Sequence, residues 1–330
     1  MDLYNTRNSW AEIWQSESGR LPLPERGVLR RRWRPDSRLG HYLGVTCDET
    51  YLYMLKLPAG TCAEPVWPRM DGCLPYCCRY GQDEYFCLQL KRREDWAVFK
   101  LLVRVVIREL EFGPEEDRFH LMGHLNALLA RCSDFFKSGS HDFGEREAKG
   151  LLGELYFLEH YVVPAVGWEY ALSCWCGPQG TPQDFAVLDT TVEIKCTQSA
   201  NRQYIHISSS RQLDTALCTS YLCVVGLAAS TGDGPEYESV SAMVERLVVL
   251  FEHNTGSAEM FLAAVSQTGY SGASDAARKA YRVLGCTFYE IREDFPRIRM
   301  EDLPLAVVSV KYSIDLLACS RFVSSPAWVK

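Results

Sequence analysis

The segment Thr191–Thr197 constrains the fold of this chain more than any other stretch. Its residues alternate between apolar and charged side chains, with Val192, Ile194 and Cys196 set against Glu193 and Lys195. A period of two is typical of a β-strand, in which successive side chains point to opposite faces. We therefore expect a strand with one face toward a hydrophobic core and the other face carrying a carboxylate and an ammonium group.

The patterns around this segment predict an α/β (α+β) protein with a mixed central sheet flanked by helices. Before it we expect strands at 51–57, 85–90 and 184–188 and helices over 95–110, 115–136 and 145–163. After it we expect strands at 203–209, 221–227, 287–291 and 306–312, a helix beginning near Arg211, and helices over 240–252 and 258–266. The predicted organisation is an N-terminal β-rich domain (1–92), a helical connector (93–144) and a core with a C-terminal α/β extension (145–330).

Length and composition indicate a globular protein without a membrane span. The chain has 330 residues, of which 47% are hydrophobic and 23% charged, the balance of an ordinary globular domain. No apolar run is long enough to cross a bilayer, and Met1–Arg20 lacks the basic and apolar parts of a secretory signal. We expect a cytoplasmic protein with reduced cysteines. The net charge of −7 argues against coating nucleic acid through bulk charge, although a local basic cleft stays compatible with it.

The helix expected over 145–163 adds a further carboxylate. Its apolar stripe consists of Leu151, Leu155, Leu158 and Val162, and Glu154 lies at the edge of that stripe. A carboxylate beside a core-facing stripe requires a partner, and a divalent cation is one candidate. The alternative for Glu154 is a surface carboxylate in water at the rim of the helix.

The two strands around Asp189-Thr190 are expected to form a hairpin. With a two-residue turn at Asp189-Thr190, Asp184 lies opposite Lys195, on the face that Glu193 shares. Two carboxylates and one ammonium group then lie on one surface. The alternative for Glu193 and Lys195 is a solvated ion pair on an edge strand, which stabilises a protein little.

These side chains have the chemistry of a divalent metal site. Mg²⁺ or Mn²⁺ takes oxygen ligands from one or two carboxylates and keeps water and phosphate oxygens as well. We expect Asp184 and Glu193 to hold the ion, with the backbone carbonyl of Ile194 as a further ligand. Lys195 would orient or help deprotonate the attacking water and offset the charge that builds up on phosphorus. This set of groups is suited to the hydrolysis of a phosphodiester.

A polar segment after the third strand of this region is a candidate for binding phosphate. It contains Arg202, Ser209, Arg211 and Gln212, and guanidinium, hydroxyl and amide groups suit phosphate oxygens. The alternative is ordinary helix capping by Ser209 or Ser210. Both interpretations are open at this point.

These residues resemble the PD-(D/E)XK nuclease superfamily, in which an acidic helix residue precedes a strand with Asp and a strand with Glu-x-Lys. Glu154, Asp184 and Glu193-Ile-Lys195 match this pattern, and Gln183 stands where the motif usually has proline. Most of the chain also looks like the bacterial family called "PD-(D/E)XK motif protein", through the segments 150–158, 171–178, 207–209, 212–213, 295–297 and 310–315. Members of that family tend to be encoded beside helicase-like, methyltransferase and other anti-phage defence genes.

The resemblance implies a restriction-endonuclease-like core and a metal-dependent DNA endonuclease of a bacterial restriction or anti-phage defence system. Asp184, Glu193 and Lys195 would carry the reaction, with Glu154 as an outer or additional metal ligand. A homodimer, or a complex with helicase-like or methyltransferase proteins, would bring together the two sites that a double-strand break requires. The alternative is a non-catalytic or partner-activated subunit with a nuclease fold that binds DNA or protein in a defence complex.

Overall fold

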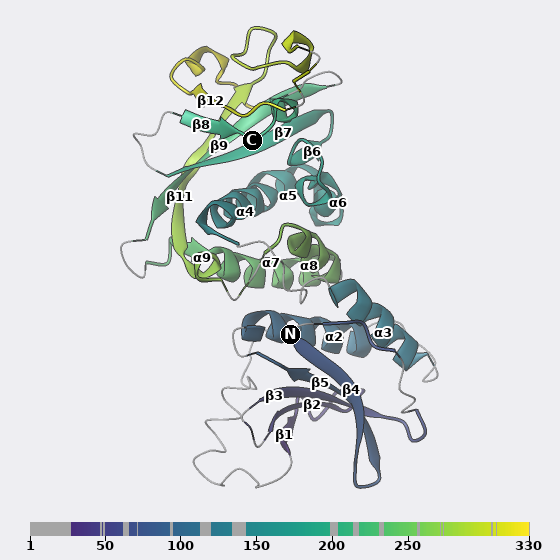
Figure 1. The fold of residues 1–330 in the computed structure, drawn as a ribbon. Coiled ribbons are helices and arrows are strands. Elements are labelled where there is room, and N and C mark those ends of the chain that lie inside the picture. Colours follow the sequence, from purple (N-terminus) through teal and green to yellow (C-terminus); the bar gives the residue numbers. More distant parts are fainter. Residues whose placement is uncertain are drawn as a thin grey trace. The chain divides into compact units, whose positions relative to one another are not determined.

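The computed structural model describes residues 28–46, 48, 50–61, 66–70, 72–92, 95–112, 120–133, 143–198, 204–213, 218–230, 234–255, 258–270, 272, 274–304, 306–307 and 309–329. The chain divides into two compact units, Met1–Ser140 and His141–Lys330. Figure 1 shows their helices and strands. The division into three parts at 92 and 144 stays a prediction.

The N-terminal unit contains an antiparallel sheet of five strands in the order β1-β2-β3-β5-β4. The strands are β1 (Val28–Arg32), β2 (His41–Thr46), β3 (Tyr51–Leu57), β4 (Cys73–Tyr80) and β5 (Asp83–Leu90), and the helices α2 (Trp96–Phe112) and α3 (Leu121–Cys132) follow them. The strand expected at 51–57 is therefore confirmed. The described part of the helix expected over 115–136 is helical only over α3.

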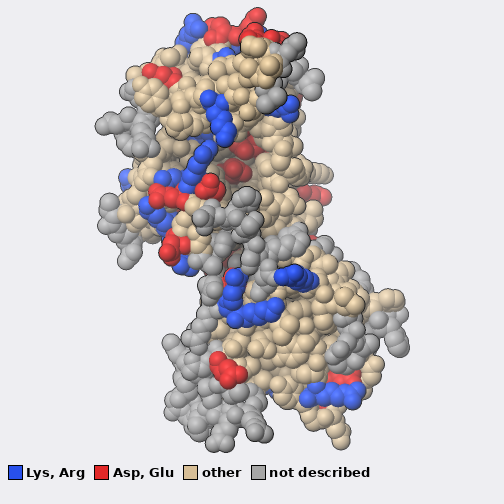
Figure 2. All heavy atoms as spheres, viewed as in Figure 1, with Lys and Arg blue, Asp and Glu red and all other residues tan. Residues whose placement is uncertain are grey.

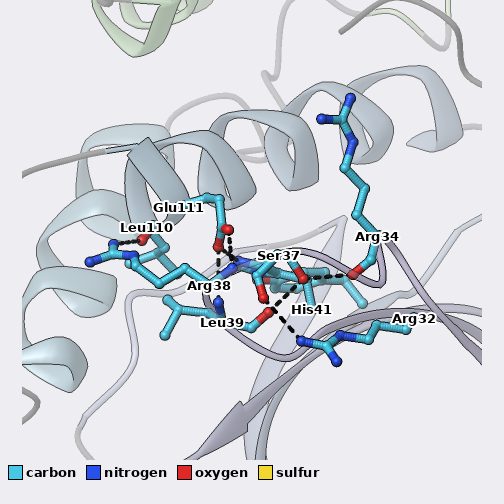
Figure 3. A network of polar contacts seen from close by, with 9 residues as sticks. Arg32, Arg34, Ser37, Arg38, Leu39, His41, Leu110 and Glu111 are labelled. Atoms are coloured by element: carbon cyan, nitrogen blue, oxygen red, sulfur yellow. Dashed lines mark hydrogen bonds and ion pairs between the residues drawn. The ribbon is translucent and has the colours of Figure 1, made fainter.

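A buried polar network joins the β1–β2 connection to the end of α2 (Figure 3). The Glu111 carboxylate accepts hydrogen bonds from the backbone N–H of Arg38 and, at 3.0 Å, from that of Leu39. His41 is fully buried, and its Nε2 lies 3.2 Å from Glu111 while its Nδ1 lies 2.8 Å from the Tyr53 hydroxyl. An Nε2–H that donates to Glu111 and an Nδ1 that accepts from Tyr53 satisfy the whole ring in its neutral form.

The C-terminal unit is built on a mixed sheet in the order β10-β11-β9-β7-β6, in which β7 and β9 are parallel and the other pairs antiparallel. Its strands are β6 (Phe185–Val187), β7 (Thr190–Gln198), β9 (Thr219–Ala229), β10 (Glu238–Ser239) and β11 (Ala280–Glu290). A second sheet pairs β8 (Tyr204–Ile207) with β12 (Tyr312–Asp315). The expected mixed α/β architecture, with a β-rich N-terminal region, is confirmed.

Helices cover one face of this mixed sheet, and β8 and β12 cover the other (Figure 1). The helices are α4 (Glu145–Phe157), the π-helical turn η3 (Leu158–Val162), α5 (Val163–Val166), α6 (Trp168–Cys174), α7 (Val240–Thr255), α8 (Ala258–Gln267) and α9 (Asp275–Arg278). Helix α4 packs on β7, and α7 packs on α4. The described residues of this unit also form the short 3₁₀ turns η4 (Gly177–Gln179), η5 (Ser210–Leu213), η6 (Met300–Asp302) and η7 (Ser320–Phe322).

Two expected elements differ from the structure. The helix expected near Arg211 is the 3₁₀ turn η5 within the described residues. The strand expected at 306–312 is wrong, because pairing with β8 begins only at Tyr312 and continues to Asp315. The apolar, β-branched run before Tyr312 has the composition of a strand, but the partner strand determines which residues join a sheet. In the described part of the chain, no helix combines the length and apolar character that crossing a membrane requires.

Candidate active site

Strand β7 lies inside the sheet, between β6 and β9. On the face of the sheet away from the helices, Glu193 is aligned with Leu222 of β9. Leu222 belongs to an apolar cluster to which β8, β12 and η7 contribute. The side chain of Glu193 is 0% exposed as a result. A solvated ion pair on an edge strand is therefore not what this segment forms. Both faces of β7 are covered, and a carboxylate lies in the interior.

The hairpin before β7 has a different register from the one expected. Phe185 pairs with Val192 and Val187 with Thr190, so the turn is Leu188-Asp189. Leu188 adopts a left-handed backbone conformation with φ of 53°. The sequence does not predict this conformation, because Gly and Asn are the residues that usually adopt it. The register is shifted by two residues, which preserves the face of each side chain.

This register brings Asp184 level with Glu193 instead of Lys195. The position is fixed by a hydrogen bond of 2.7 Å from the backbone N–H of Ile194 to Asp184 Oδ2. On the other side, the backbone N–H groups of Cys176 and Gly177 donate to the Asp184 carbonyl at 2.8 and 3.0 Å. Asp184 is thus held from both of its neighbouring segments.

Lys195 and Glu193 form an ion pair on the same face of β7. The Lys195 side chain is 17% exposed, so its ammonium group lies at the boundary between the interior and solvent. The pair uses Glu193 Oε1, whereas Glu193 Oε2 is buried and has no hydrogen-bond partner among the described residues. An unsatisfied buried carboxylate oxygen is costly, and in a folded protein it calls for an explanation such as a bound cation.

Glu154 reaches the site because α4 packs unusually close to β7. A Cβ at Gly153 would overlap the sulfur of Cys196 and lie 3.4 Å from Ile194. Only glycine permits this approach, which places the following residue, Glu154, beside the sheet. Its Oε2 accepts a hydrogen bond of 2.8 Å from the indole N–H of the buried Trp175. Glu154 is partly buried and has a protein partner, so it is not the free surface carboxylate of the alternative interpretation.

Gly177 leaves a space between two of the carboxylates. A Cβ at this position would lie 3.2 Å from Asp184 Oδ1 and 3.3 Å from Glu154 Oε2. The surrounding segment is tied to β6 by a bridge between Trp175 and Phe185. The absence of a side chain at Gly177 therefore keeps a small volume open next to oxygen atoms from two different elements.

The carboxyl groups of the site all have raised pKa values. Burial, reinforced by the charge of Asp184, raises the pKa of Glu193 well above its ordinary value, and burial also raises the pKa of Asp184. Burial and the charge of Asp184 raise the pKa of Glu154 to about 8, against the effect of the Trp175 hydrogen bond. Burial disfavours the Lys195 ammonium, but the neighbouring carboxylates outweigh it and raise the pKa of Lys195. The single positive charge of Lys195 is therefore too little to keep all three carboxyl groups ionised at their ordinary pKa values.

A family model described as "Putative PD-(D/E)XK family member, (DUF4420)" matches residues 6–317. The chain belongs to this family. No curated protein and no solved structure matches the chain. Membership of the PD-(D/E)XK family supports a nuclease fold for this protein.

PD-(D/E)XK nucleases typically use divalent metal ions, and the side chains present here fit such an ion. The buried Glu193 Oε2 has no hydrogen-bond partner within the described residues, and carboxylate oxygens are the ligands that Mg²⁺ prefers. In the described part of the chain, no three His, Cys, Asp or Glu side chains converge as a ready-made metal cluster. Two carboxylates completed by water and substrate phosphate are the arrangement that Mg²⁺ commonly takes. The roles of Asp184, Glu193, Ile194 and Glu154 as ligands stay predictions.

The residues expected to contact nucleic acid lie mostly in and around η5. Arg202 lies outside the described residues. Ser209 Oγ accepts a hydrogen bond of 3.3 Å from the Arg211 N–H, which is a capping contact. Gln212 Oε1 accepts one of 2.8 Å from the N–H of Ser208, and Arg211 is exposed. Figure 2 shows acidic side chains recessed in a hollow of this unit, with Lys and Arg side chains along its rim.

Three residues of the site were not expected from the sequence to have a role there. Trp175 donates a hydrogen bond to Glu154, Gly177 has no side chain to fill the space beside Glu154 and Asp184, and Gly153 permits the approach of α4 to β7. Trp175, Gly177 and Gly153 all lie in segments that carry the family resemblance. That resemblance was the available signal, but nothing in the residue types indicates which carboxylate a tryptophan N–H will reach.

Proposed function

We propose that this protein is a Mg²⁺- or Mn²⁺-dependent endonuclease that hydrolyses phosphodiester bonds of DNA. The observation that carries the proposal is the buried Glu193, whose Oε2 has no partner among the described residues, next to Asp184 and Lys195. A purely structural role leaves this oxygen without a partner, whereas a bound cation would supply one.

Asp184 and Glu193 would hold the metal ion, with Glu154 as an outer or additional ligand. A bound Mg²⁺ supplies Lewis acidity at the phosphoryl group and lowers the pKa of a water molecule. The raised pKa of Lys195 keeps its ammonium group charged at neutral pH. Lys195 is therefore suited to orient the attacking water and to offset negative charge on the phosphorus, while deprotonating the water would require the neutral amine.

The experiment is cleavage of supercoiled and linear plasmid DNA in Mg²⁺, in Mn²⁺ and in EDTA. Wild-type protein and Lys195→Ala are compared, with Lys56→Ala as a matched control because Lys56 forms an exposed ion pair with Asp83. We expect metal-dependent cutting by wild type and by Lys56→Ala, and loss of cutting in Lys195→Ala. Equal cutting by Lys195→Ala, or cutting in EDTA, would contradict the proposal.

A second candidate function is a partner-activated or non-catalytic subunit of a defence complex. One observation favours it: within the described residues no three metal-ligating side chains are already gathered. A helicase-like or methyltransferase partner, or a second copy of the chain in a homodimer, would then complete or position the site. DNA binding without cleavage by the isolated protein, and cleavage only after a partner is added, would support this second function.

A further inference from the structure

Gln183 occupies the position at which the PD-(D/E)XK motif usually has proline, and it makes a contact that proline cannot make. Its side-chain amide, Nε2, donates a hydrogen bond of 2.9 Å to the backbone carbonyl of Arg211. The two residues are 28 positions apart in the sequence. The bond joins the segment directly before Asp184 to the turn η5.

The Asp184 end of this connection is firmly held. The Thr181 hydroxyl lies 2.8 Å from the carbonyl of Gln183 and 2.9 Å from that of Cys176. Cys176 in turn donates its backbone N–H to the Asp184 carbonyl at 2.8 Å. Gln183 is therefore part of a short loop whose two sides are fixed to each other next to the candidate metal ligand.

The η5 end is also ordered by specific contacts. Leu213 is fully buried, and Gln212 closes the turn by accepting from the N–H of Ser208. Arg211 is exposed. Arg146, an exposed residue in the first turn of α4, lies with Nη2 3.4 Å from Ser208 Oγ. Two guanidinium groups from different elements are thus attached to or next to the same turn, and guanidinium groups bind phosphate with two parallel hydrogen bonds.

We propose that Gln183 is a positioning residue that holds Arg211 at a fixed place relative to Asp184, so that Arg211, together with Arg146, binds a backbone phosphate next to the one being hydrolysed. The inference takes its substrate class, a nucleic acid, from the proposed function. Its physical basis is preorganisation: a phosphate contact that is already at the right distance from the carboxylates does not have to be ordered when substrate binds.

The test is a double-mutant cycle on binding of a fluorescein-labelled DNA duplex, measured by anisotropy in EDTA so that no cleavage occurs. The variants are Gln183→Leu, Arg211→Ala and the double variant. Gln183→Leu removes the tether without touching the Arg211 side chain, and Arg211→Ala leaves the backbone carbonyl that Gln183 binds. We expect each single variant to weaken binding about 5- to 10-fold and the double variant to bind no more weakly than Arg211→Ala, because coupled residues are not additive.

Two controls separate positioning from general destabilisation. Gln179→Leu changes an exposed glutamine in the same loop and should leave binding unchanged. The salt dependence of binding should fall by about one phosphate contact in Arg211→Ala, and in Arg146→Ala as well. A loss of folding in Gln183→Leu would instead lower binding further in the Arg211→Ala background.

Additive losses in the double variant, unchanged binding by Gln183→Leu, or no binding of the duplex by wild type would each overturn the inference. Failure of the proposed hydrolysis is a separate result, because it is measured by plasmid cleavage in metal. If cleavage depends on Lys195 but the binding losses are additive, the proposed nuclease activity is supported and the positioning role of Gln183 is contradicted. If the binding losses are non-additive and no cleavage occurs, the positioning role of Gln183 is supported and the partner-activated subunit is favoured.

Discussion

Each unit of this protein buries a polar network, and the two networks differ in how completely their atoms are paired. In the N-terminal unit, Glu111 accepts hydrogen bonds from two backbone N–H groups and contacts His41, which also contacts Tyr53. In the C-terminal unit, Glu193 is more deeply buried than Glu111, yet one of its carboxylate oxygens has no partner among the described residues. Burial alone therefore does not distinguish a structural network from a functional one.

The difference lies in charge compensation. The network in the N-terminal unit holds a neutral imidazole, since burial lowers the pKa of His41 to about 4, and its one carboxylate receives donors from three residues. In the C-terminal unit, Glu193 pairs with the Lys195 ammonium group, Glu154 and Asp184 lie close enough to interact with it electrostatically, and the pKa of each of the three carboxyl groups is raised. The first arrangement contributes to folding, whereas the second disfavours the charged form of its carboxyl groups, a cost that the proposed metal ion would offset.

The largest effect expected from this comparison is that of Asp184→Asn, which should lower the cleavage activity and raise the stability of the protein. The amide oxygen can still accept from the Ile194 N–H, so the local structure is retained while one buried charge is removed. Because the pKa of Asp184 is raised in the folded chain, its ionised form costs stability at neutral pH. We expect plasmid cleavage to fall by about 100-fold or more and the thermal unfolding temperature to rise. The exposed Asp275→Asn should change neither, and a lower unfolding temperature in Asp184→Asn would break the comparison.

The opposite outcome is expected for Glu111→Ala. This change leaves the N–H of Arg38, the N–H of Leu39 and the Nε2–H of His41 without their acceptor. We expect a loss of about 3 kcal/mol in the free energy of unfolding of the N-terminal unit, measured by urea denaturation and by amide hydrogen exchange. Glu111→Gln keeps one acceptor oxygen and should lose less. Equal losses in both variants would mean that packing, and not the acceptor, is what Glu111 provides.

A third test uses pH, because His41 titrates differently in the folded and unfolded chain. Its pKa is about 4 when folded and about 6.5 when unfolded. Between these values the unfolded chain binds a proton that the folded chain does not, so stability is complete above pH 6.5 and falls as the pH decreases. We expect a loss of about 2 kcal/mol between pH 7 and pH 5 in urea denaturation of the N-terminal unit. His41→Phe should reduce this slope, whatever its own stability, and an unchanged slope would exclude His41 as its source.

The smallest effect expected concerns the packing that brings Glu154 to the site. A Cβ at Gly153 overlaps the Cys196 sulfur, whereas one at Gly150 of the same helix meets nothing within 4 Å. Gly153→Ala should cost about 1 to 2 kcal/mol and reduce cleavage, and adding Cys196→Ala should restore part of both. Gly150→Ala should instead stabilise α4 by roughly 0.5–1 kcal/mol in urea denaturation. A full loss of cleavage in Gly150→Ala would show that cleavage is sensitive to any Gly→Ala change in α4, and not specifically to the contact at Gly153.

The order of helix and strand patterns along the chain is enough to predict the mixed fold, and the period of two around β7 is enough to predict the strand and its charged residues Glu193 and Lys195. It did not reveal that Glu193 is buried, because alternation shows that two faces differ and not what covers each face. The covering layer comes from β8 and β12, and β12 lies more than 100 residues further along the chain. Such long-range contacts have no local signature in the sequence.

The prediction of the hairpin register was wrong for a different reason. Composition favours Asp189-Thr190 as the turn, because these residues have the more usual turn chemistry. The structure uses Leu188-Asp189, with Leu188 in the left-handed region and 69% exposed. Tertiary contacts selected this turn, including the hydrogen bond of 3.0 Å from the indole N–H of Trp328 to Thr190. A side chain near the C-terminus thus holds the start of the strand that carries the site.

The raised pKa of Asp184 also has an evolutionary consequence. Most substitutions in a protein reduce its stability, and chance loss of residues is restrained by that cost. At Asp184 the cost acts in reverse, since a neutral replacement removes a carboxylate whose ionised form burial disfavours. Glu193 differs, because its loss would leave Lys195 without its ion-pair partner. If the proposed hydrolysis were no longer needed in a lineage, Asp184 would therefore be expected to be replaced early.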